Sequence, residues 1–187
     1  LRGNQLIDYL QNKEKLSSLS SQKNDEIIKD LTDKIIKLGG KINKNNKDQA
    51  LSIKDLNRQF EKLSVGSILK DKSKNIIKDQ DINNVKVRFQ KIFELPFKDL
   101  RKLIDEGKKD LKEGIIVIYA INDNKVGLAV GVTKSLENKF DAVKIVKIGS
   151  EIIGGKGGGG RVDFAQAGGT LPDKIEDSFK NIKKLIN

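Results

Sequence analysis

The sequence predicts an α+β protein in which a helical segment, residues 1–80, precedes a small globular α/β domain, residues 81–187. The prediction rests on a change in the spacing of apolar residues. Up to about residue 80 they recur every three or four positions, as on one face of a helix. Beyond that point, alternating and continuous apolar runs appear, which are typical of strands. A domain of ~105 residues is long enough to bury a core of its own.

Two apolar seams in the helical segment advance in steps of three and four, as in a coiled coil. The first contains Ile28, Leu31, Ile35, Leu38 and Ile42, and the second contains Ile53, Leu56, Phe60 and Leu63. They predict two helices folded back on each other so that the seams are buried together. Two features compete for the end of the first helix. Gly39-Gly40 is typical of a C-cap, whereas the polar stretch 43–49 is typical of a turn.

Three leucines predict an additional helix nearer the start of the chain. They are Leu6, Leu10 and Leu16. We expect this helix to end in the serine cluster Ser17–Ser21, and Asn24 or Asp25 to cap the next one. Residues 70–80 are rich in Lys and Asp and are predicted to be a connector.

The globular domain begins with a predicted strand followed by a helix. The strand has one buried and one solvated face, because its apolar and polar residues alternate. The apolar residues are Val85, Val87 and Phe89, and the polar residues are Lys86, Arg88 and Gln90. Pro96 suits a helix start, and a helical stripe follows it, made of Phe97, Leu100, Ile104 and Leu111.

A hairpin and two more helices are predicted to follow. Ile115–Ile121 is continuously apolar, which indicates a strand covered on both faces. After the turn 122–125, apolar residues from Val126 to Val132 alternate with Gly127, Ala129 and Gly131, which would let another element pack closely on one face. One helix is indicated by Phe140, Val143, Val146 and Ile153; the last begins at Leu171-Pro172-Asp173 and buries Ile175, Phe179, Ile182 and Leu185. The predicted order is strand, helix, strand, strand, helix, glycine-rich loop, helix.

The composition excludes several classes of chemistry. The chain contains no Cys and no His, so disulfide scaffolds, thiol catalysis, His-dependent triads and most zinc sites are excluded. We therefore expect no catalytic residue, no metal and no cofactor in this chain. The chain also lacks Met and begins Leu1-Arg2-Gly3, which suggests a piece of a longer polypeptide. It has no apolar run of about 18 residues and no signal-peptide pattern, so we expect a cytoplasmic protein without membrane contact.

The charge balance is basic. Lys and Arg number 37 against 26 Asp and Glu, for a net charge of +11, which favours contact with nucleic acid or an anionic surface. The cations are 32 Lys and only 5 Arg, and Ile and Asn are abundant. An AT-rich genome would produce the same bias, so charge alone does not establish nucleic-acid binding.

The most informative segment is the glycine-rich loop 154–160, followed by Arg161. Three interpretations compete. A phosphate cradle would use Gly155, Gly157 and Gly160 as G-x-G-x-x-G, but the loop follows a helix rather than a strand, and Lys156 lacks the Ser or Thr that would follow it in a Walker loop. A flexible linker is common for such composition but does not suit the inside of a domain. The third is a loop whose backbone closely approaches a polymer phosphate or another chain.

The stretch GGKGGGGRVDFAQAGG resembles the signature near the end of alanyl-tRNA synthetases, in the DHHA1 domain that they share with DHH-type phosphodiesterases. The strands VIYA and GLAVGV before it are also similar. The resemblance is strongest over residues 82–187, and residues 1–80 resemble the helical section that joins this domain to the editing domain. The loop has one glycine more than is usual, and Val162 and Phe164 replace common Pro and Met. Arg161 stands where the phosphodiesterases have His, which favours the synthetase branch.

The resemblance implies a binding and bridging module. The ATP-dependent aminoacylation core and the zinc-dependent editing domain of that family lie upstream. Its C-terminal region contacts the outer corner of tRNA, links aminoacylation to editing and contributes to self-association. The partners implied are tRNA with an alanine acceptor, the upstream domains of the same polypeptide and a second copy of the chain. Two alternatives stay open: a homo-oligomerisation arm with incidental RNA contact, and the C-terminal domain of a free-standing alanyl-tRNA editing protein.

The candidate RNA-binding residues come from the loop, the small-residue run after it and one helix face. An ordinary solvated face explains the helix cations equally well, and Gln166 could instead hydrogen-bond the glycine loop and fix its shape. The candidates are Gly154, Gly155, Lys156, Gly157, Gly158, Gly159, Gly160, Arg161, Gln166, Gly168, Gly169, Lys98, Arg101 and Lys102, with Lys109 on the same helix face.

Overall fold

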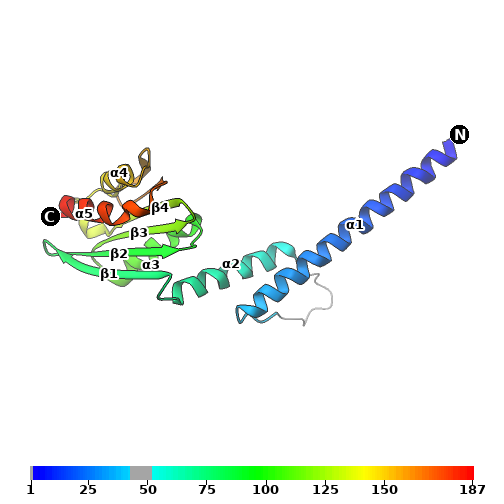
Figure 1. The fold of residues 1–187 in the computed structure, drawn as a ribbon, viewed down its shortest axis with the longest axis horizontal. Coiled ribbons are helices and arrows are strands. Elements are labelled where there is room, and N and C mark those ends of the chain that lie inside the picture. The colour runs from blue at the N-terminus through cyan, green and yellow to red at the C-terminus, as the bar shows by residue number, and fades with distance from the viewer. Residues whose placement is uncertain (1, 43–51) are drawn as a thin grey trace. The chain divides into compact units, whose positions relative to one another are not determined.

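A computed structural model describes the backbone of residues 2–42 and 52–187 and the side chains of residues 20–42 and 52–187. The chain divides into two compact units, one ending at Ser67 and the other beginning at Ile68 (Figure 1). In the described part, no helix is both long and apolar enough to cross a bilayer.

The first unit is a helical hairpin of α1, Arg2–Lys37, and α2, Ile53–Lys70, whose end extends past the unit boundary. The predicted seams meet as expected. The buried residues are Leu31, Ile35 and Leu56, and the half-buried ones packed on them are Ile28, Ile42, Ile53, Phe60 and Leu63. Leu38 departs from the prediction. It follows the end of α1 and is 36% exposed.

The glycine pair after α1 ends this helix. Gly39 has a φ of +78°, a left-handed conformation that costs glycine little because it has no Cβ. Its N–H donates to the carbonyl of Ile36, and that of Gly40 donates to the carbonyl of Ile35, each at 2.9 Å. These two bonds form a Schellman motif, which satisfies carbonyls at the helix end. Of the two features that competed for this end, the C-cap is confirmed, and the whole polar stretch 43–49 lies outside the described residues.

Two predictions for this half of the chain are wrong. α1 is continuous through Ser17–Ser21, so no helix ends there and Asn24 and Asp25 cap nothing. Serine costs only ~0.5 kcal/mol in a helix, and neither Gly nor Pro interrupts this stretch. The helical segment also stops before residue 80, because residues 75–82 form an edge strand. That strand is largely exposed, so it lacks the apolar alternation that would have revealed it.

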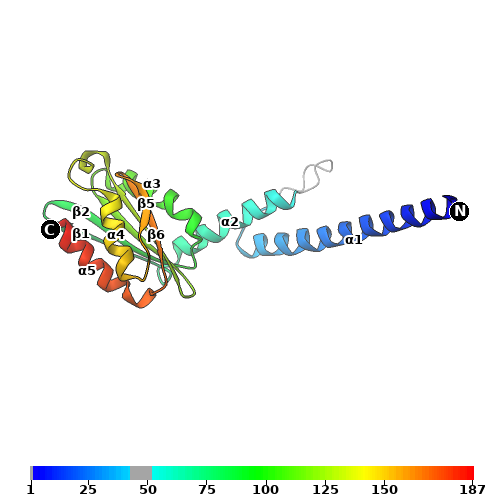
Figure 2. The same cartoon turned by 90° about the horizontal axis from the view of Figure 1, so that it is seen from above.

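The second unit has three layers. A six-stranded mixed sheet, in the order β1-β2-β3-β4-β6-β5, is covered by α3 on one face and by α4 and α5 on the other (Figures 1 and 2). β2 and β3 are parallel, and all other neighbours are antiparallel. The strands are β1 Asn75–Ile82, β2 Val85–Phe93, β3 Ile115–Asn122, β4 Lys125–Val132, β5 Gly158–Arg161 and β6 Phe164–Gly169. The helices are η1 Phe97–Asp99, α3 Leu100–Leu111, η2 Lys134–Leu136, α4 Ala142–Ile152, η3 Pro172–Lys174 and α5 Ile175–Ile186.

The predicted strands β2, β3 and β4 and all three predicted helices are confirmed. Two further strands were not predicted: β5 overlaps the predicted glycine-rich loop 154–160, and β6 lies in the small-residue run that follows it. Glycine is unfavourable in strands, and β5 is exposed along its whole length, so no alternation marks it. In α5, the end of the buried stripe is Ile186 rather than Leu185, which is 42% exposed. The step from Ile182 to Ile186 follows the helical repeat.

The small residues of β4 allow α3 to approach the sheet closely, as predicted. A Cβ built on Gly131 would lie 2.3 Å from the Cγ2 of Ile104, and one on Gly127 would lie 2.7 Å from Cδ1 of Phe97. Real Cβ atoms do not make such contacts, so a side chain at either glycine would push η1 and α3 away from the sheet. The position of this helix therefore depends on the absence of side chains at Gly127 and Gly131.

The opposite face of the sheet carries the larger core cluster, which α4 and α5 complete. Phe179 of α5 makes edge-to-face contacts with Phe89 and Tyr119, each with centroids 4.7 Å apart. The hydroxyl of Ser178 donates to the carbonyl of Gly149 at 2.9 Å and accepts from the Tyr119 hydroxyl, since each hydroxyl has one proton. Burial raises the pKa of Tyr119, so this hydroxyl stays protonated. The chain of bonds ties β3, α5 and α4 together inside an apolar layer.

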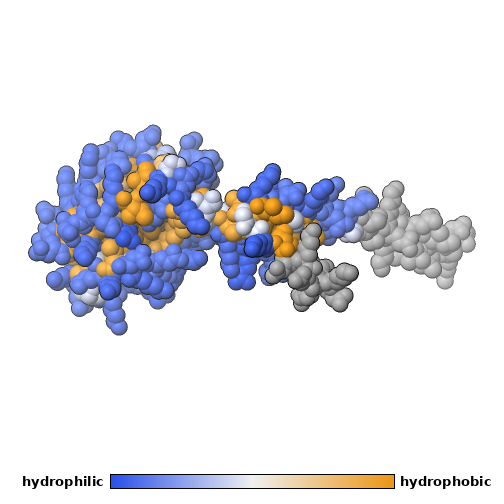
Figure 3. Space-filling model, turned by 90° about the horizontal axis from the view of Figure 1, so that it is seen from below, coloured by the Kyte–Doolittle hydropathy of each residue, from blue (hydrophilic) through white to orange (hydrophobic). Residues whose placement is uncertain are grey.

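The outer surface of this unit is mostly hydrophilic. Figure 3 shows one face, on which charged and polar side chains surround a smaller hydrophobic area. Arg88 is one of the few charged groups that is largely buried, with a side chain 17% exposed. It binds Asp79 of β1 through two hydrogen bonds of 2.8 Å and reaches Asp110 of α3 at 3.4 Å. This arginine therefore fastens the edge strand β1 to its neighbour β2 and to a helix.

We predict that Ser178→Ala destabilises the chain more than Tyr119→Phe. The first change leaves the buried Tyr119 hydroxyl without an acceptor, which costs about 1–3 kcal/mol. The second leaves the bond from Ser178 to Gly149 intact and costs about 1 kcal/mol. Urea unfolding of both variants measures the free energies. Equal losses below about 0.5 kcal/mol would mean that the bond chain contributes no stability.

We predict that Asp79→Asn removes a pH-dependent part of the stability. The hydrogen bond from Arg88 lowers the pKa of Asp79 below its usual value. A carboxylate with a lowered folded pKa adds stability above its unfolded pKa of about 4, and this is lost as pH falls through the folded pKa. The stability gap between wild type and Asp79→Asn should therefore be constant near neutral pH and shrink below about pH 4. Unfolding curves from pH 7 to pH 2 test this, and a gap that grows on acidification would contradict it.

Candidate nucleic-acid interface

The glycine-rich loop begins as the C-cap of α4. Gly154 has a φ of +76°, and the N–H of Gly155 donates to the carbonyl of Ser150 at 2.8 Å. The carbonyl of Ile153 accepts from both Thr170 and Leu171 at 2.9 Å. The loop is therefore fixed to the helix that precedes it and to the chain that leaves β6.

The hairpin of β5 and β6 is fixed at its turn. The carbonyl of Asp163 accepts from Val132 at the end of β4, and that of Val162 accepts from Ala142 at the start of α4, each at 2.9 Å. The Asp163 carboxylate also lies 3.3 Å from the Lys108 ammonium of α3. Elements from both faces of the sheet thus hold this turn, which indicates a well-positioned hairpin rather than a flexible linker.

The glycines in this region differ in what they do. A Cβ on Gly158 would lie 2.5 Å from the carbonyl of Gln166, and one on Gly155 would lie 2.1 Å from the carbonyl of Gly168. Packing therefore requires both glycines. A Cβ on Gly159 would meet nothing within 4 Å, and this residue has no left-handed backbone to explain it. Gly159 thus leaves exposed backbone that another molecule can approach.

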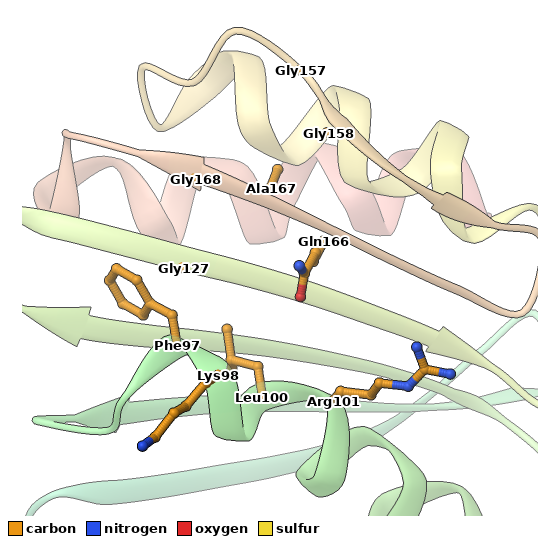
Figure 4. Close-up of a pocket in the computed structure, with 10 residues that line it drawn as sticks. All are labelled: Phe97, Lys98, Leu100, Arg101, Gly127, Gly157, Gly158, Gln166, Ala167 and Gly168. Carbon is orange, nitrogen blue, oxygen red and sulfur yellow. The ribbon is translucent and has the colours of Figure 1, made fainter.

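A groove of about 600 Å³ runs between this hairpin and the start of α3. η1 and the first turn of α3 form one wall, and β6 with the glycine loop forms the other, as Figure 4 shows. Six of the predicted residues line it: Lys98, Arg101, Gly157, Gly158, Gln166 and Gly168. Four residues that the sequence did not indicate as functional also line it: Phe97, Leu100, Gly127 and Ala167. In the sequence, these apolar and small residues indicated only packing in the core. The lining of the groove uses residues of the same kinds, so the sequence alone did not distinguish the two roles.

The groove combines polar groups with an aromatic ring. The Gln166 side chain extends from β6 toward α3, between Phe97 and Arg101 (Figure 4). Within the described residues, no hydrogen bond joins the Gln166 amide to the glycine loop, so the structure does not support the alternative in which this side chain fixes the loop. The guanidinium of Arg101 lies 5.2 Å from the centroid of the Phe164 ring, a cation–π distance that orients its plane. The groove therefore presents an oriented cation and a side-chain amide.

The other predicted residues lie outside the lining of the groove. Lys156, Gly159, Gly160 and Arg161 are exposed along the loop and β5. Lys102 is exposed on α3, with its ammonium 3.9 Å from the Glu106 carboxylate. Lys109 is exposed further along α3. Packing explains the glycines at the ends of the region, since a Cβ on Gly169 would lie 2.5 Å from Ile153. The last two predicted residues outside the groove are Gly154 and Gly155, at the C-cap of α4.

Comparison with known proteins assigns a family to the unit that carries this groove. The DHHA1 domain matches residues 84–187, more than half of the chain. The chain belongs to the DHHA1 domain family. Curated relatives are the alanine–tRNA ligases of Parvibaculum lavamentivorans and Bradyrhizobium diazoefficiens, 44% and 40% identical over 108 residues. Each match covers 57% of this chain and 12% of the ligase, so the chain spans a small part of the length of these relatives.

A solved structure supports the same relationship. The C-Ala domain of alanyl-tRNA synthetase from Aquifex aeolicus is similar with a TM-score of 0.56 and 28% identity. The match covers 58% of this chain and 97% of that domain. The α+β fold and the resemblance described from the sequence are thereby confirmed, and the DHHA1 domain of this chain corresponds to a C-terminal module of the synthetase.

We predict that Gly158→Ala and Gly159→Ala behave differently although the residues are neighbours. The first places a methyl group against the backbone of Gln166 and should cost about 1–3 kcal/mol of stability. The second points into open space and should change stability by less than about 0.5 kcal/mol. Thermal or urea unfolding measures both, and a larger loss for Gly159→Ala would show that β5 packs differently.

Proposed function

We propose that this chain is the tRNA-binding C-terminal module of an alanine–tRNA ligase, which contacts the outer corner of the folded tRNA and connects the aminoacylation and editing domains. The groove beside β6 carries the proposal, because it brings Lys98 and Arg101 opposite exposed glycine backbone. The ligase activity belongs to the parent protein, and the aminoacylation and editing domains upstream are its partners within the same polypeptide. In this proposal, the chain itself binds tRNA and catalyses no reaction.

The chemistry of the groove suits folded RNA. Proteins recognise such RNA through its shape and through phosphate and 2′-hydroxyl contacts. These need cations and close backbone approach more than they need side chains that read base edges. Gly159 leaves backbone exposed, and Lys156 and Arg161 lie on either side of the glycine run. We infer that Lys102 extends the same cationic surface along α3.

The division into two units suits a bridging module. Residues 68–187 contain the groove and their own core, and the unit formed by the helical hairpin ends at residue 67. In the proposal, the hairpin spans the distance to the upstream domains while the DHHA1 domain contacts the tRNA.

We predict salt-dependent binding of intact tRNA. Each phosphate contact adds to the slope of log K against log salt concentration. Arg101→Ala should weaken tRNA binding and lower that slope by about 1. Lys156→Ala and Arg161→Ala should likewise weaken tRNA binding and lower the slope. Lys144→Ala is the matched control, since Lys144 is exposed on α4, across the sheet from the groove. Fluorescence anisotropy with labelled tRNA at several salt concentrations measures affinity and slope.

Two RNA controls test whether shape is read. One is a duplex of the same length, and the other is the same tRNA with its outer corner disrupted. Preferential binding of the intact tRNA supports the proposal. If all three RNAs bind alike, or if Arg101→Ala and Lys144→Ala lower affinity equally, the interaction is general charge attraction and the proposed function is wrong.

A second candidate function, a homo-oligomerisation arm, is favoured by one observation. On the helical hairpin, Ile27 and Ile36 are 43% and 57% exposed, and Figure 3 shows hydrophobic surface on this unit. Exposed apolar side chains of this kind can pair two copies. Sedimentation at several protein concentrations separates the candidates, because a strict monomer that binds tRNA excludes the arm.

A further inference from the structure

The groove offers more than phosphate binding requires. Its lining includes the ring of Phe97, the side chain of Leu100 and the methyl group of Ala167, together with glycine backbone. Phosphate is hydrophilic and gains nothing from aromatic and aliphatic walls. An apolar and flat group that also carries polar edges matches this lining better.

The facing walls have the character of a stacking slot. Phe97 is half-buried and lies on the wall formed by η1 and α3, and Gly157, Gly158 and Gly168 lie on the facing wall (Figure 4). No side chain projects from these three glycines. Between an aromatic ring and bare peptide planes, a planar ring system has apolar contact on both sides. Gly127 contributes the floor, where the absence of a Cβ allows the close contact with Phe97.

The polar groups between the walls suit the edge of a nucleobase. The Gln166 amide is exposed, extends toward α3 and makes no hydrogen bond within the described part of the chain. An amide carries both a donor and an acceptor, which is the arrangement that pairs with the edge of a base. The guanidinium of Arg101 lies on one side of Gln166 in Figure 4, and it is 5.2 Å from the centroid of the Phe164 ring. A cation held in this way can bind the phosphate attached to that base.

The geometry points to a pocket for one unpaired nucleotide, with the base stacked on Phe97, its edge bonded to Gln166 and its phosphate bound to Arg101. This inference rests on the proposed function, because it names the part of an RNA that enters the groove. It also extends that function, because a protein that recognises RNA by its shape alone does not need to bind a base in a pocket. A paired base is excluded, because its partner would occupy the position of the Gln166 amide.

The test uses short single-stranded RNA probes and the whole chain. The probes are five uridine-flanked trinucleotides, four of which differ only in the central base while the fifth has an abasic centre. Backbone amide signals of Gly157, Gly158 and Gly168 and the side-chain amide of Gln166 report binding by NMR. We expect the abasic probe to bind about tenfold more weakly than the best of the four bases, as the loss of one stacked base implies.

Three variants separate the contributions. Phe97→Leu keeps an apolar side chain against Gly127 and should reduce the advantage of a base over the abasic centre to less than about twofold. Gln166→Ala should remove the differences among the four bases. Arg101→Ala should weaken all five probes alike. Phe140→Leu and Gln80→Ala are matched controls, since both positions are half-buried outside the groove, and neither should change the pattern. A thermal melt of each variant confirms that it is folded.

The outcomes distinguish this inference from the proposed function. If intact tRNA binds and Arg101→Ala weakens it, but the abasic probe binds as well as the others, the nucleotide pocket is wrong and the tRNA-binding function stands. The pocket is also wrong if Phe97→Leu weakens the abasic and base-containing probes equally. If the trinucleotides show the expected pattern but tRNA binds no better than the duplex, the pocket stands and the tRNA-binding function fails.

Discussion

The close approach of α3 to the sheet is the contact on which the candidate site depends. It exists because one face of β4 carries Gly127, Ala129 and Gly131 in succession, so that Ile104 and Phe97 lie where larger side chains would otherwise be. This contact sets the position of the wall that carries Lys98 and Arg101. A Cβ at Gly127 or Gly131 would collide with Phe97 or Ile104 and so would displace that wall. A residue with no side chain thus controls the geometry of charged groups on a different element.

The opposite wall depends on a second constraint, the attachment of the β5–β6 hairpin. Its turn is bound to the end of β4, the start of α4 and Lys108 of α3. Glycine lets β5 lie against β6 and α4 without collision, as the position of Gly158 demonstrates. Because a glycine chain loses much conformational freedom when it is ordered, these attachments are needed to keep the wall in place. They explain how a run that is typical of a linker becomes part of a sheet.

The roles of the cations follow from this geometry rather than from the total charge. A net charge of +11 acts over the whole surface and is weakened by salt. Arg101 is different, because the Phe164 ring orients it beside a groove. Arg88 has a structural role instead, because its ion pairs with Asp79 and Asp110 join β2 to β1 and to α3. The similarity to the C-Ala domain of alanyl-tRNA synthetase relates these cations to a known domain, and the groove shows where Arg101 lies on it.

The sequence by itself determined the helical seams, the strands with regular apolar patterns and the family, because each is encoded by local spacing or by a contiguous motif. It also identified the residues of the glycine loop and Gln166. It did not reveal β1 or β5, because exposed edge strands bury too little to need a pattern. It did not reveal β6 either, because the small residues of this internal strand give no clear apolar alternation. Nor did it reveal that Phe97 faces Gly168, or that Gln166 stands beside Arg101. Those pairs are far apart in the chain, and only the packing of α3 and β6 on β4 brings them together.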